Sequence, residues 1–224
     1  MARILCIETS TKVCSVGLSE DGHIAKLEED LSNRYSHAER VNVFIQEVLK
    51  STDFSDLDAV AVSAGPGSYT GLRIGVSTAK GICLGQNLPL IAVNPLEAMA
   101  SRIDAGEGTL KIPMIDARRM EVFCAGYDSK GERVFKTRAE IIDADSFSEF
   151  SNFSEILYFG DGAEKCVEVL KERGYRYTEV YTSASGTAKL AENKFQKKDF
   201  ESLAYFEPFY LKDFVAGKPK KRLP

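Results

Sequence analysis

The order of predicted strands and helices occurs twice in this sequence, and this repeat constrains the fold more than any other feature. An apolar run at residues 3–8 predicts a strand, and residues 112–116 restart the pattern in the second half. Each half reads β-β-β-α-β-α. The first half predicts strands at 3–8, 13–18, 24–31, 59–64 and 89–93 and helices at 36–50, 69–84 and 95–103. The second predicts strands at 112–116, 121–127, 133–142, 155–159 and 175–180 and helices at 163–173 and 183–192.

Three strands in succession, followed by units in which helix and strand alternate, predict a mixed sheet with helices on its faces. Asp21-Gly22 and Lys130-Gly131 mark the hairpin turns within the two halves. Two such lobes side by side make an α/β, duplicated ribonuclease-H-like fold. We expect one lobe at 1–105 and a second at 106–224. The aromatic segment 200–214 should form a helix and an extended stretch, and pack back on the first lobe.

Composition excludes some classes of function. The formal net charge is −4, which argues against broad coating of nucleic acid. No apolar run reaches the length of a signal peptide or a membrane span, so we expect a cytoplasmic protein. The five cysteines form no C-x-x-C pair and lie among apolar neighbours, so we expect reduced thiols buried in the core. The basic end at 218–222 is either a solvated tail or a phosphate or partner contact.

The most informative local motif is a glycine turn at 65–67, which follows an apolar strand and opens a helix. Gly65 and Gly67 allow backbone angles that a Cβ would forbid, and Ser68 and Thr70 are placed to cap the helix. Such a junction either offers N–H groups to a phosphate or lets another backbone approach closely. The motif lacks the Gly-Lys-Ser/Thr of a P-loop, and its spacing is one residue too long for a dinucleotide fingerprint.

The first two long helices are candidates for a partner surface. Gly71, Gly75 and Ala79 form a stripe of small residues along the second helix, which serves either internal packing or close approach of another subunit. In the first helix an apolar stripe that includes Phe44 faces one way, and Val43 lies on the opposite flank. An extra apolar flank is typical of a surface that a second protein buries.

Four sequence blocks resemble the bacterial TsaB family, also called YeaZ. They are Ile7-Glu-Thr-Ser-Thr11, Gly65-Pro-Gly-Ser-Tyr-Thr-Gly-Leu-Arg-Ile-Gly75, Ile115-Asp-Ala-Arg-Arg119 and Pro208-Phe-Tyr-Leu211. The resemblance spans nearly the whole chain and implies an actin/Hsp70-like two-lobe fold. It also implies a role in making threonylcarbamoyladenosine beside the anticodon of certain tRNAs. Family members are partners of the catalytic paralogue TsaD and cooperate with the ATPase TsaE; contact with tRNA is indirect.

The resemblance further implies that the two helices form a helical bundle with TsaD and that the isolated protein pairs with itself there as a homodimer. Arg73 and Lys80 would be rim contacts. His37 is either a capping or surface side chain or part of this contact. The predicted interface residues are His37, Arg40, Val41, Phe44, Ile45, Val48, Gly71, Arg73, Gly75, Val76, Ala79 and Lys80. We predict no cofactor for this chain alone and expect ATP, Mg²⁺ and metal in the partner subunits.

A nucleotide site of the actin type would lie at two hairpins, one in each lobe. The first keeps hydroxyls but no glycine, and carries Glu8 where the family usually has Asp, which adds a methylene. In the second, Ala117 and Arg118 put side chains where close backbone approach is needed, although arginine also attracts phosphate. The residues of this vestigial nucleotide site are Glu8, Thr9, Ser10, Gly65, Gly67, Ser68 and Asp116.

Two enzymatic alternatives stand beside the partner role. An active ATP-dependent phosphotransferase would use Glu8, Asp116 and the glycine turn. A metallopeptidase is a remote alternative, because His23 and His37 are the only histidines and do not have the four-residue helical spacing of a metal pair. No Gly-x-Ser-x-Gly elbow is present either. We therefore predict no catalytic residue and no metal ligand in this chain.

Overall fold

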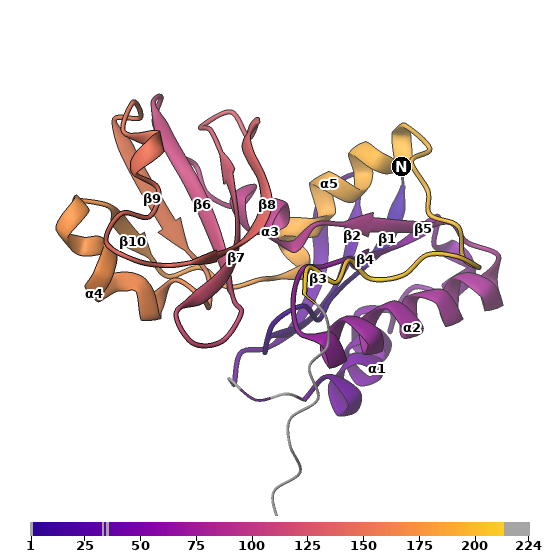
Figure 1. Ribbon diagram of the computed structural model, residues 1–224. Coiled ribbons are helices and arrows are strands. Elements are labelled where there is room, and N and C mark those ends of the chain that lie inside the picture. The colour runs from indigo at the N-terminus through magenta and orange to yellow at the C-terminus, as the bar shows by residue number, and fades with distance from the viewer. Residues whose placement is uncertain (1, 33, 35, 213–224) are drawn as a thin grey trace, which may run out of the picture.

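The computed structural model describes residues 2–32, 34 and 36–212, and consists of two lobes that are each built on one five-stranded sheet (Figure 1). The first sheet has the order β3-β2-β1-β4-β5, and the second has β10-β9-β6-β7-β8. If β6 is matched with β1, β7 with β2 and so on, the two orders are the same. The predicted duplicated α/β fold is therefore confirmed. The first sheet contains β1 (Arg3–Glu8), β2 (Cys14–Glu20), β3 (His23–Asp30), β4 (Ala59–Ser63) and β5 (Leu90–Val93). The second contains β6 (Thr109–Asp116), β7 (Glu121–Tyr127), β8 (Arg133–Ile141), β9 (Glu155–Phe159) and β10 (Arg176–Thr178).

Local sequence explains the pairing in each sheet. Asp21 and Gly22 both have positive φ, as a two-residue hairpin turn between β2 and β3 requires. β1 pairs antiparallel with β2 and parallel with β4. Because β1 and β4 are covered on both faces, their residues are buried in succession, with an apolar run inside each strand instead of an alternation. β1 and β4 therefore end side by side, at the same edge of the first sheet. The first hairpin follows β1 there, and the glycine turn follows β4.

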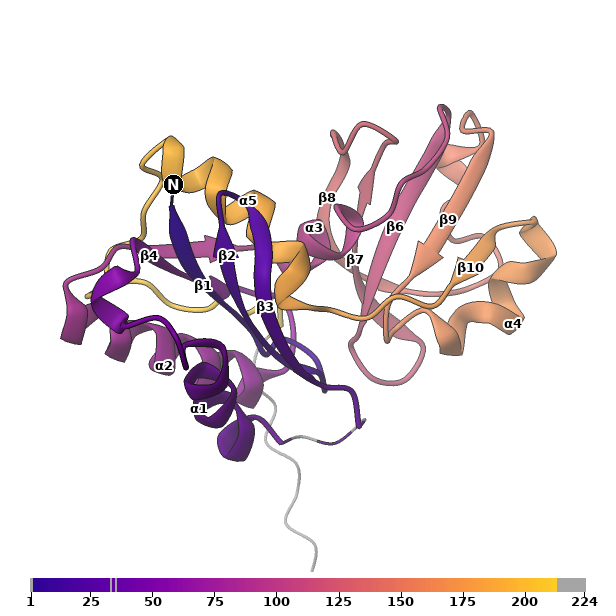
Figure 2. The same ribbon diagram turned by 180° about the vertical axis from the view of Figure 1, so that it is seen from behind.

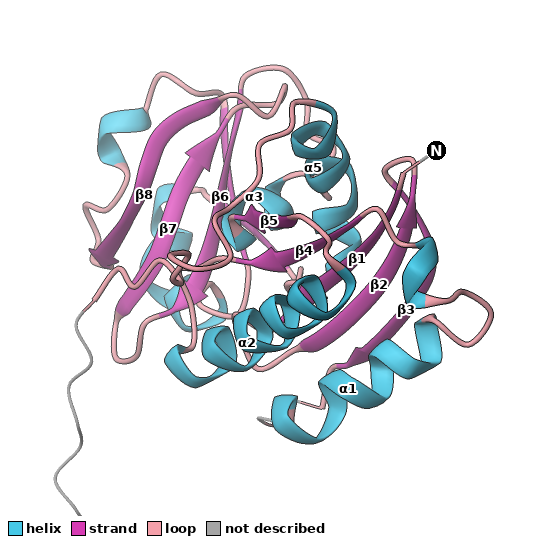
Figure 3. Cartoon of the chain, turned by 90° about the vertical axis from the view of Figure 1, so that its right-hand side faces the viewer, coloured by secondary structure: helices cyan, strands magenta, loops and turns pink. Residues whose placement is uncertain are grey.

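Helices cover the two faces of the first sheet. α1 (His37–Val48) and α2 (Tyr69–Gln86) lie side by side on one face (Figure 3). α5 (Ala184–Gln196) lies on the opposite face, although it follows the second sheet in the chain (Figure 2). In return, α3 (Pro95–Ala100) packs on the second sheet, with Leu96 and Met99 in its core. The predicted division between 105 and 106 separates the two sheets, but α3 and α5 each pack across it.

The second lobe departs from the predicted helices. The expected helix at 163–173 is broken into α4 (Val167–Leu170) between two 3-10 turns, Glu164–Cys166 and Lys171–Arg173. Between β8 and β9, where the repeat calls for a helix, the chain forms only a 3-10 turn at Ser148–Phe150. The first lobe has one further 3-10 turn, at Phe54–Asp56. The long helices of this protein thus belong to the first sheet.

Residues 199–212, which we call the strap, run from the first lobe to the second. The described part of segment 200–214 contains turns and extended chain, so the predicted helix there is wrong. The Glu201 N–H bonds to the Leu90 carbonyl at the edge of β5, and Pro208 has no N–H for a helix to use. Phe206 packs on the core of the first lobe, and Leu211 packs on that of the second. The strap therefore ties the lobes together, and the basic end at 218–222 lies outside the described residues.

Two general predictions can be checked against the fold. All five cysteines are free and buried. Within the described ranges, no helix combines the length and apolar character that a membrane crossing needs.

Candidate functional site

The glycine turn after β4 is a point of close backbone approach. Gly65 has φ +100°, and a Cβ on Gly67 would lie 2.3 Å from the carbonyl oxygen of Ser10. The Ser68 N–H donates to that same oxygen at 2.6 Å, and the Ser68 hydroxyl accepts from the Gly71 N–H as the cap of α2. The Ser68 and Gly71 N–H groups therefore already have hydrogen-bond acceptors within the chain. This geometry favours a structural role for the turn over phosphate binding.

The small residues of α2 face the first hairpin of the same chain. A Cβ on Gly71 would lie 2.1 Å from the Thr9 carbonyl oxygen, and one on Gly75 would lie 2.2 Å from Thr9 Oγ1. That hydroxyl donates to the Gly71 carbonyl at 2.8 Å, and Ala79 is fully buried. Internal packing explains this stripe, so the prediction that these three residues form a partner surface is wrong.

The apolar stripe of α1 is also internal. Phe44 and Ile45 are only 7% and 3% exposed and belong to the core between the first sheet and its helices. Val41 and Val48 lie in that core too, so none of these four side chains offers a surface to a partner. His37 is buried, with Nε2 2.8 Å from the Thr11 carbonyl oxygen, and burial lowers its pKa. The helical period correctly identified the apolar face of α1, but the first sheet of the same chain covers that face, so it is not free for a partner.

The exposed faces of α1 and α2 are formed by other residues. Arg40 and Val43 lie outward on α1, and Arg73 lies outward on α2. Leu84 is the most exposed aliphatic side chain of the described helices, at 78%. It was not predicted, although it follows Ser77 and Gly81 at helical spacing on the face opposite to Ala79. Gly81 and Gly85 share this face, and an added Cβ on either would meet nothing within 4 Å.

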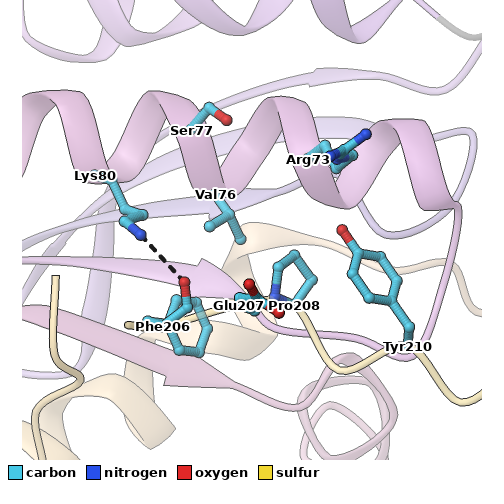
Figure 4. A pocket seen from close by; sticks show the side chains of 8 residues that line it. All are labelled: Arg73, Val76, Ser77, Lys80, Phe206, Glu207, Pro208 and Tyr210. Atoms are coloured by element: carbon cyan, nitrogen blue, oxygen red, sulfur yellow. Dashed lines mark hydrogen bonds between the residues drawn. The ribbon is translucent and has the colours of Figure 1, made fainter. Parts of the chain in front are cut away.

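A groove of about 300 Å³ separates α2 from the strap (Figure 4). Lys80 Nζ donates to the Phe206 carbonyl at 3.1 Å and closes one end. At the other end, Arg73 lies over the ring of Tyr69 at 5.0 Å, and the ring of Tyr69 packs on that of Tyr210. Val76 is buried in the core of the first lobe and lies at the middle of the groove.

The first hairpin of the vestigial nucleotide site is closed. Glu8, Thr9 and Ser10 are fully buried. Glu8 Oε1 accepts from the Ser10 N–H at 2.6 Å and the Ser10 hydroxyl at 2.5 Å, whereas Oε2 has no hydrogen-bond partner within the described part of the chain. Burial raises the pKa of Glu8 to about 7, the Ser10 bonds oppose this, and the charge of Asp161 adds a little. A phosphate has no open surface here.

The second hairpin is open. The Asp116 side chain is 41% exposed and pairs with Lys165, and its backbone N–H donates to Asp161 Oδ1 at 3.2 Å. Burial raises the pKa of Asp161 to about 6, and Asp116 adds to the shift, whereas the Asp116 N–H and the charges of Lys12 and Lys165 oppose it. Asp116 is therefore exposed to solvent, whereas the predicted site residues of the first hairpin are buried. No group of three or more His, Cys, Asp or Glu among the described residues could hold a metal ion.

Comparisons with known proteins place the chain in a family. The family model described as TsaD, tRNA N6-adenosine threonylcarbamoyltransferase, matches residues 32–222. The Escherichia coli K12 protein named tRNA threonylcarbamoyladenosine biosynthesis protein TsaB is 32% identical, over 96% of this chain and 97% of its own length. Among solved structures, YeaZ from Pseudomonas aeruginosa has a TM-score of 0.77 at 25% identity and covers 94% of this chain and 100% of its own. A Clostridium difficile dehydratase activator, solved with ADPNP bound, shares the fold alone, with a TM-score of 0.52 at 9% identity over 89% of this chain and 98% of its own. The chain therefore belongs to the TsaB family.

Proposed function

We propose that this chain is a non-catalytic subunit in the biosynthesis of threonylcarbamoyladenosine on tRNA, and that it acts by binding the catalytic paralogue TsaD. The observation that carries the proposal is the closed first hairpin. Gly67 and Gly71 hold the backbone of residues 9 and 10 at van der Waals distance, so the chain's own atoms fill the space that a phosphate would need. Family membership supports a role in this process, and the packing of the first hairpin supports a non-catalytic role.

The binding surface that we propose is the outward face of α1 and α2, around Val43 and Leu84. Val43 and Leu84 are exposed large apolar side chains, one on each helix, and an exposed apolar patch is typical of a face that a partner buries. In the absence of TsaD, a second copy of this chain would occupy the same face as a homodimer. TsaE and tRNA would join the assembly through TsaD. The site of action would be the cytoplasm, where tRNA is modified.

The test is reconstitution of threonylcarbamoyl transfer to tRNA, with each component left out in turn. We expect no transfer without this chain and no ATP turnover by this chain alone. Leu84→Glu should abolish co-purification with TsaD, because it places a charge in the proposed contact. Ile141→Glu is the matched control, because Ile141 is 72% exposed but lies on β8. The proposed surface would be contradicted if both variants lost binding to the same extent, or if neither variant lost it.

An ATP-dependent phosphotransferase is the second candidate, and the open second hairpin favours it. Arg118 and Arg119 are exposed at its tip, beside the Asp116 carboxylate. Guanidinium groups bind phosphate in bidentate geometry. Calorimetry of the isolated chain with Mg-ATP separates the candidates: micromolar binding followed by turnover would favour the enzyme, and Asp116→Asn should then remove the turnover.

A further inference from the structure

The tip of the second hairpin carries two adjacent arginines. Arg118 and Arg119 connect β6 to β7, and both residues are exposed. Neither guanidinium forms an ion pair with a residue in the described part of the chain. Their two positive charges are therefore available to a ligand.

The acidic groups at the base of this hairpin are already engaged. The Asp116 carboxylate pairs with Lys165, and the Glu121 carboxylate pairs with Lys212. Lys165 also donates to the Glu121 carbonyl at 2.7 Å, and Asp161 accepts the Asp116 N–H at 3.2 Å. Because lysines compensate the two carboxylates nearest the tip, the arginines add a positive charge that these neighbours do not cancel.

The backbone at the tip is held in a conformation that arginine does not favour. φ is +71° at Arg118 and +52° at Arg119, in the left-handed region where a Cβ is unfavourable. The Arg118 N–H donates to Asp116 Oδ1 at 2.9 Å, and the Arg118 carbonyl accepts from the Glu121 N–H at 3.2 Å. Glycine or asparagine would suit this backbone better. The turn itself therefore does not explain why arginine stands at both positions.

The strap leads the chain to this hairpin. It ends at Lys212, which pairs with Glu121 at the start of β7, and Figure 3 shows the end of the strap beside β7 and β8. Four of the next ten residues in the sequence are basic, namely Lys218, Lys220, Lys221 and Arg222. An extended chain advances roughly 3.5 Å per residue, so the six residues from 212 to 218 span up to roughly 20 Å. The basic segment 218–222 can therefore contact the same ligand as the hairpin.

Cations on a hairpin tip and on a following segment match a polymer of phosphates better than a single phosphorylated molecule. A nucleoside triphosphate held between the lobes would also need the first hairpin, which Gly67 and Gly71 keep closed. Arginine and lysine instead neutralise phosphates along a nucleic-acid backbone, whatever its sequence. The net charge of −4 argues against broad coating of nucleic acid and is compatible with a local basic patch.

We propose that the tip of the second hairpin and the basic segment 218–222 bind the phosphate backbone of the tRNA. Arg118 and Arg119 hold phosphates through their guanidinium groups, and the segment adds contacts along the same RNA. The inference rests on the proposed function, because the complex with TsaD brings the tRNA to this chain. It adds a direct contact with the RNA to the indirect one through TsaD, and it places this contact on the second lobe.

The experiment measures the affinity of the complex of this chain and TsaD for a substrate tRNA, by fluorescence anisotropy over a series of salt concentrations. Arg118→Gln combined with Arg119→Gln should weaken binding about tenfold or more at low salt. The slope of log Kd against log salt should fall by about 0.7–0.9 for each phosphate contact that is lost. Lys220→Gln combined with Lys221→Gln should lower affinity and slope in the same way. Because phosphates carry no sequence information, a tRNA with a changed anticodon loop should show the same losses.

Matched variants separate charge from position. Lys197→Gln combined with Lys198→Gln removes an adjacent exposed pair from the first lobe, where Lys198 also has a left-handed backbone with φ +54°. This variant should bind tRNA as wild type does. Arg118→Lys combined with Arg119→Lys keeps the charges and should keep most of the affinity. Urea unfolding of each variant checks that the fold is retained, and the variant of segment 218–222 tests the contact without altering the hairpin.

The outcomes distinguish the inference from the proposed function. If every variant co-purifies with TsaD and its tRNA affinity and salt slope match those of wild type, the RNA contact is overturned and the proposed function stands. If the hairpin variant loses TsaD instead of tRNA, the ligand of this patch is an acidic surface of TsaD, and the assignment to RNA is wrong. If Mg-ATP abolishes the difference between wild type and the hairpin variant, the arginines bind nucleotide, and the assignment is again wrong. If wild type does not bind TsaD, the proposed function fails, and the same salt series on the isolated chain decides the inference.

Discussion

The two lobes have the same glycine turn at corresponding positions. Gly65 in the first lobe and Gly160 in the second have φ of +100° and +109°, and each comes after the strand that is parallel to the central one. Gly67 and Gly162 both lie against the backbone of the neighbouring hairpin, at Ser10 and Ile115. The turn geometry is therefore a property of the shared topology, and phosphate binding is not needed to explain it.

The helix after the turn differs between the lobes. α2 has 18 residues and covers the first hairpin, whereas α4 has 4 residues and leaves the second hairpin open. The carboxylates at corresponding strand ends reflect this, because Glu8 is fully buried and the side chain of Asp116 is 41% exposed. The long helix that closes the first hairpin also has a free outer face. The same long helix therefore both closes the first hairpin and presents an exposed outer face.

The largest expected effect comes from opening that closed hairpin. Gly71→Ala places a Cβ 2.1 Å from the Thr9 carbonyl oxygen, and neither backbone can move without disturbing the sheet or α2. We expect a loss of about 3 kcal/mol in the free energy of unfolding, measured with urea. Gly81→Ala, on the same helix but in open space, should instead gain about 1 kcal/mol. A similar loss in both variants would show that helix propensity and not contact with the hairpin governs Gly71.

The sequence predicted this architecture well where local signals are strong. The Asp21-Gly22 turn, the Ser68 cap and the strand runs each depend on their immediate neighbours, so element type and order could be derived. Prediction from the sequence failed where the outcome depends on contacts between residues that lie far apart in the chain. Periodicity marked the apolar face of Phe44 but could not say whether a sheet or a partner covers it. In the same way, nothing local indicates that α5 returns to the first sheet or that the strap crosses between lobes.

The buried Glu8 should make stability depend on pH in an unusual direction. Burial raises its pKa from 4.5 to about 7, so the folded state binds more protons than the unfolded state between these values. The free energy of unfolding should therefore fall as pH rises from about 4.5 to about 7, by roughly 3 kcal/mol, and then level off. Glu8→Gln has no proton to release and should remove the contribution of Glu8 to this decline, which leaves the curve level between about 6 and 7, measured by urea unfolding at a series of pH values.

A second buried carboxylate, Asp161 in the second lobe, provides the control. The pKa of Asp161 is raised from 3.8 to about 6, so its contribution falls in a lower and partly overlapping window. Asp161→Asn should remove the share of the decline that Asp161 contributes between about 3.8 and 6, and leave the decline from about 6 to 7 in place, because Glu8 still titrates there. If that decline persisted in Glu8→Gln and vanished in Asp161→Asn, the assignment of the two groups would be reversed.

The smallest effect tests the strain of the open hairpin. Arg118 and Arg119 have φ of +71° and +52°, a left-handed conformation that costs residues with a Cβ roughly 1–2 kcal/mol. Glycine removes this strain but gains entropy in the unfolded chain, so Arg118→Gly should raise the free energy of unfolding by no more than about 1 kcal/mol. Arg133→Gly is the control, because Arg133 is exposed in the extended strand β8 and its replacement should lower stability. A gain at Arg118 would mean that the second lobe keeps an arginine at a cost to its own stability, as a side chain that binds an anion or a partner would require. A loss would mean that Arg118 is held by contacts within the fold, and the open hairpin would then be as structural as the closed one.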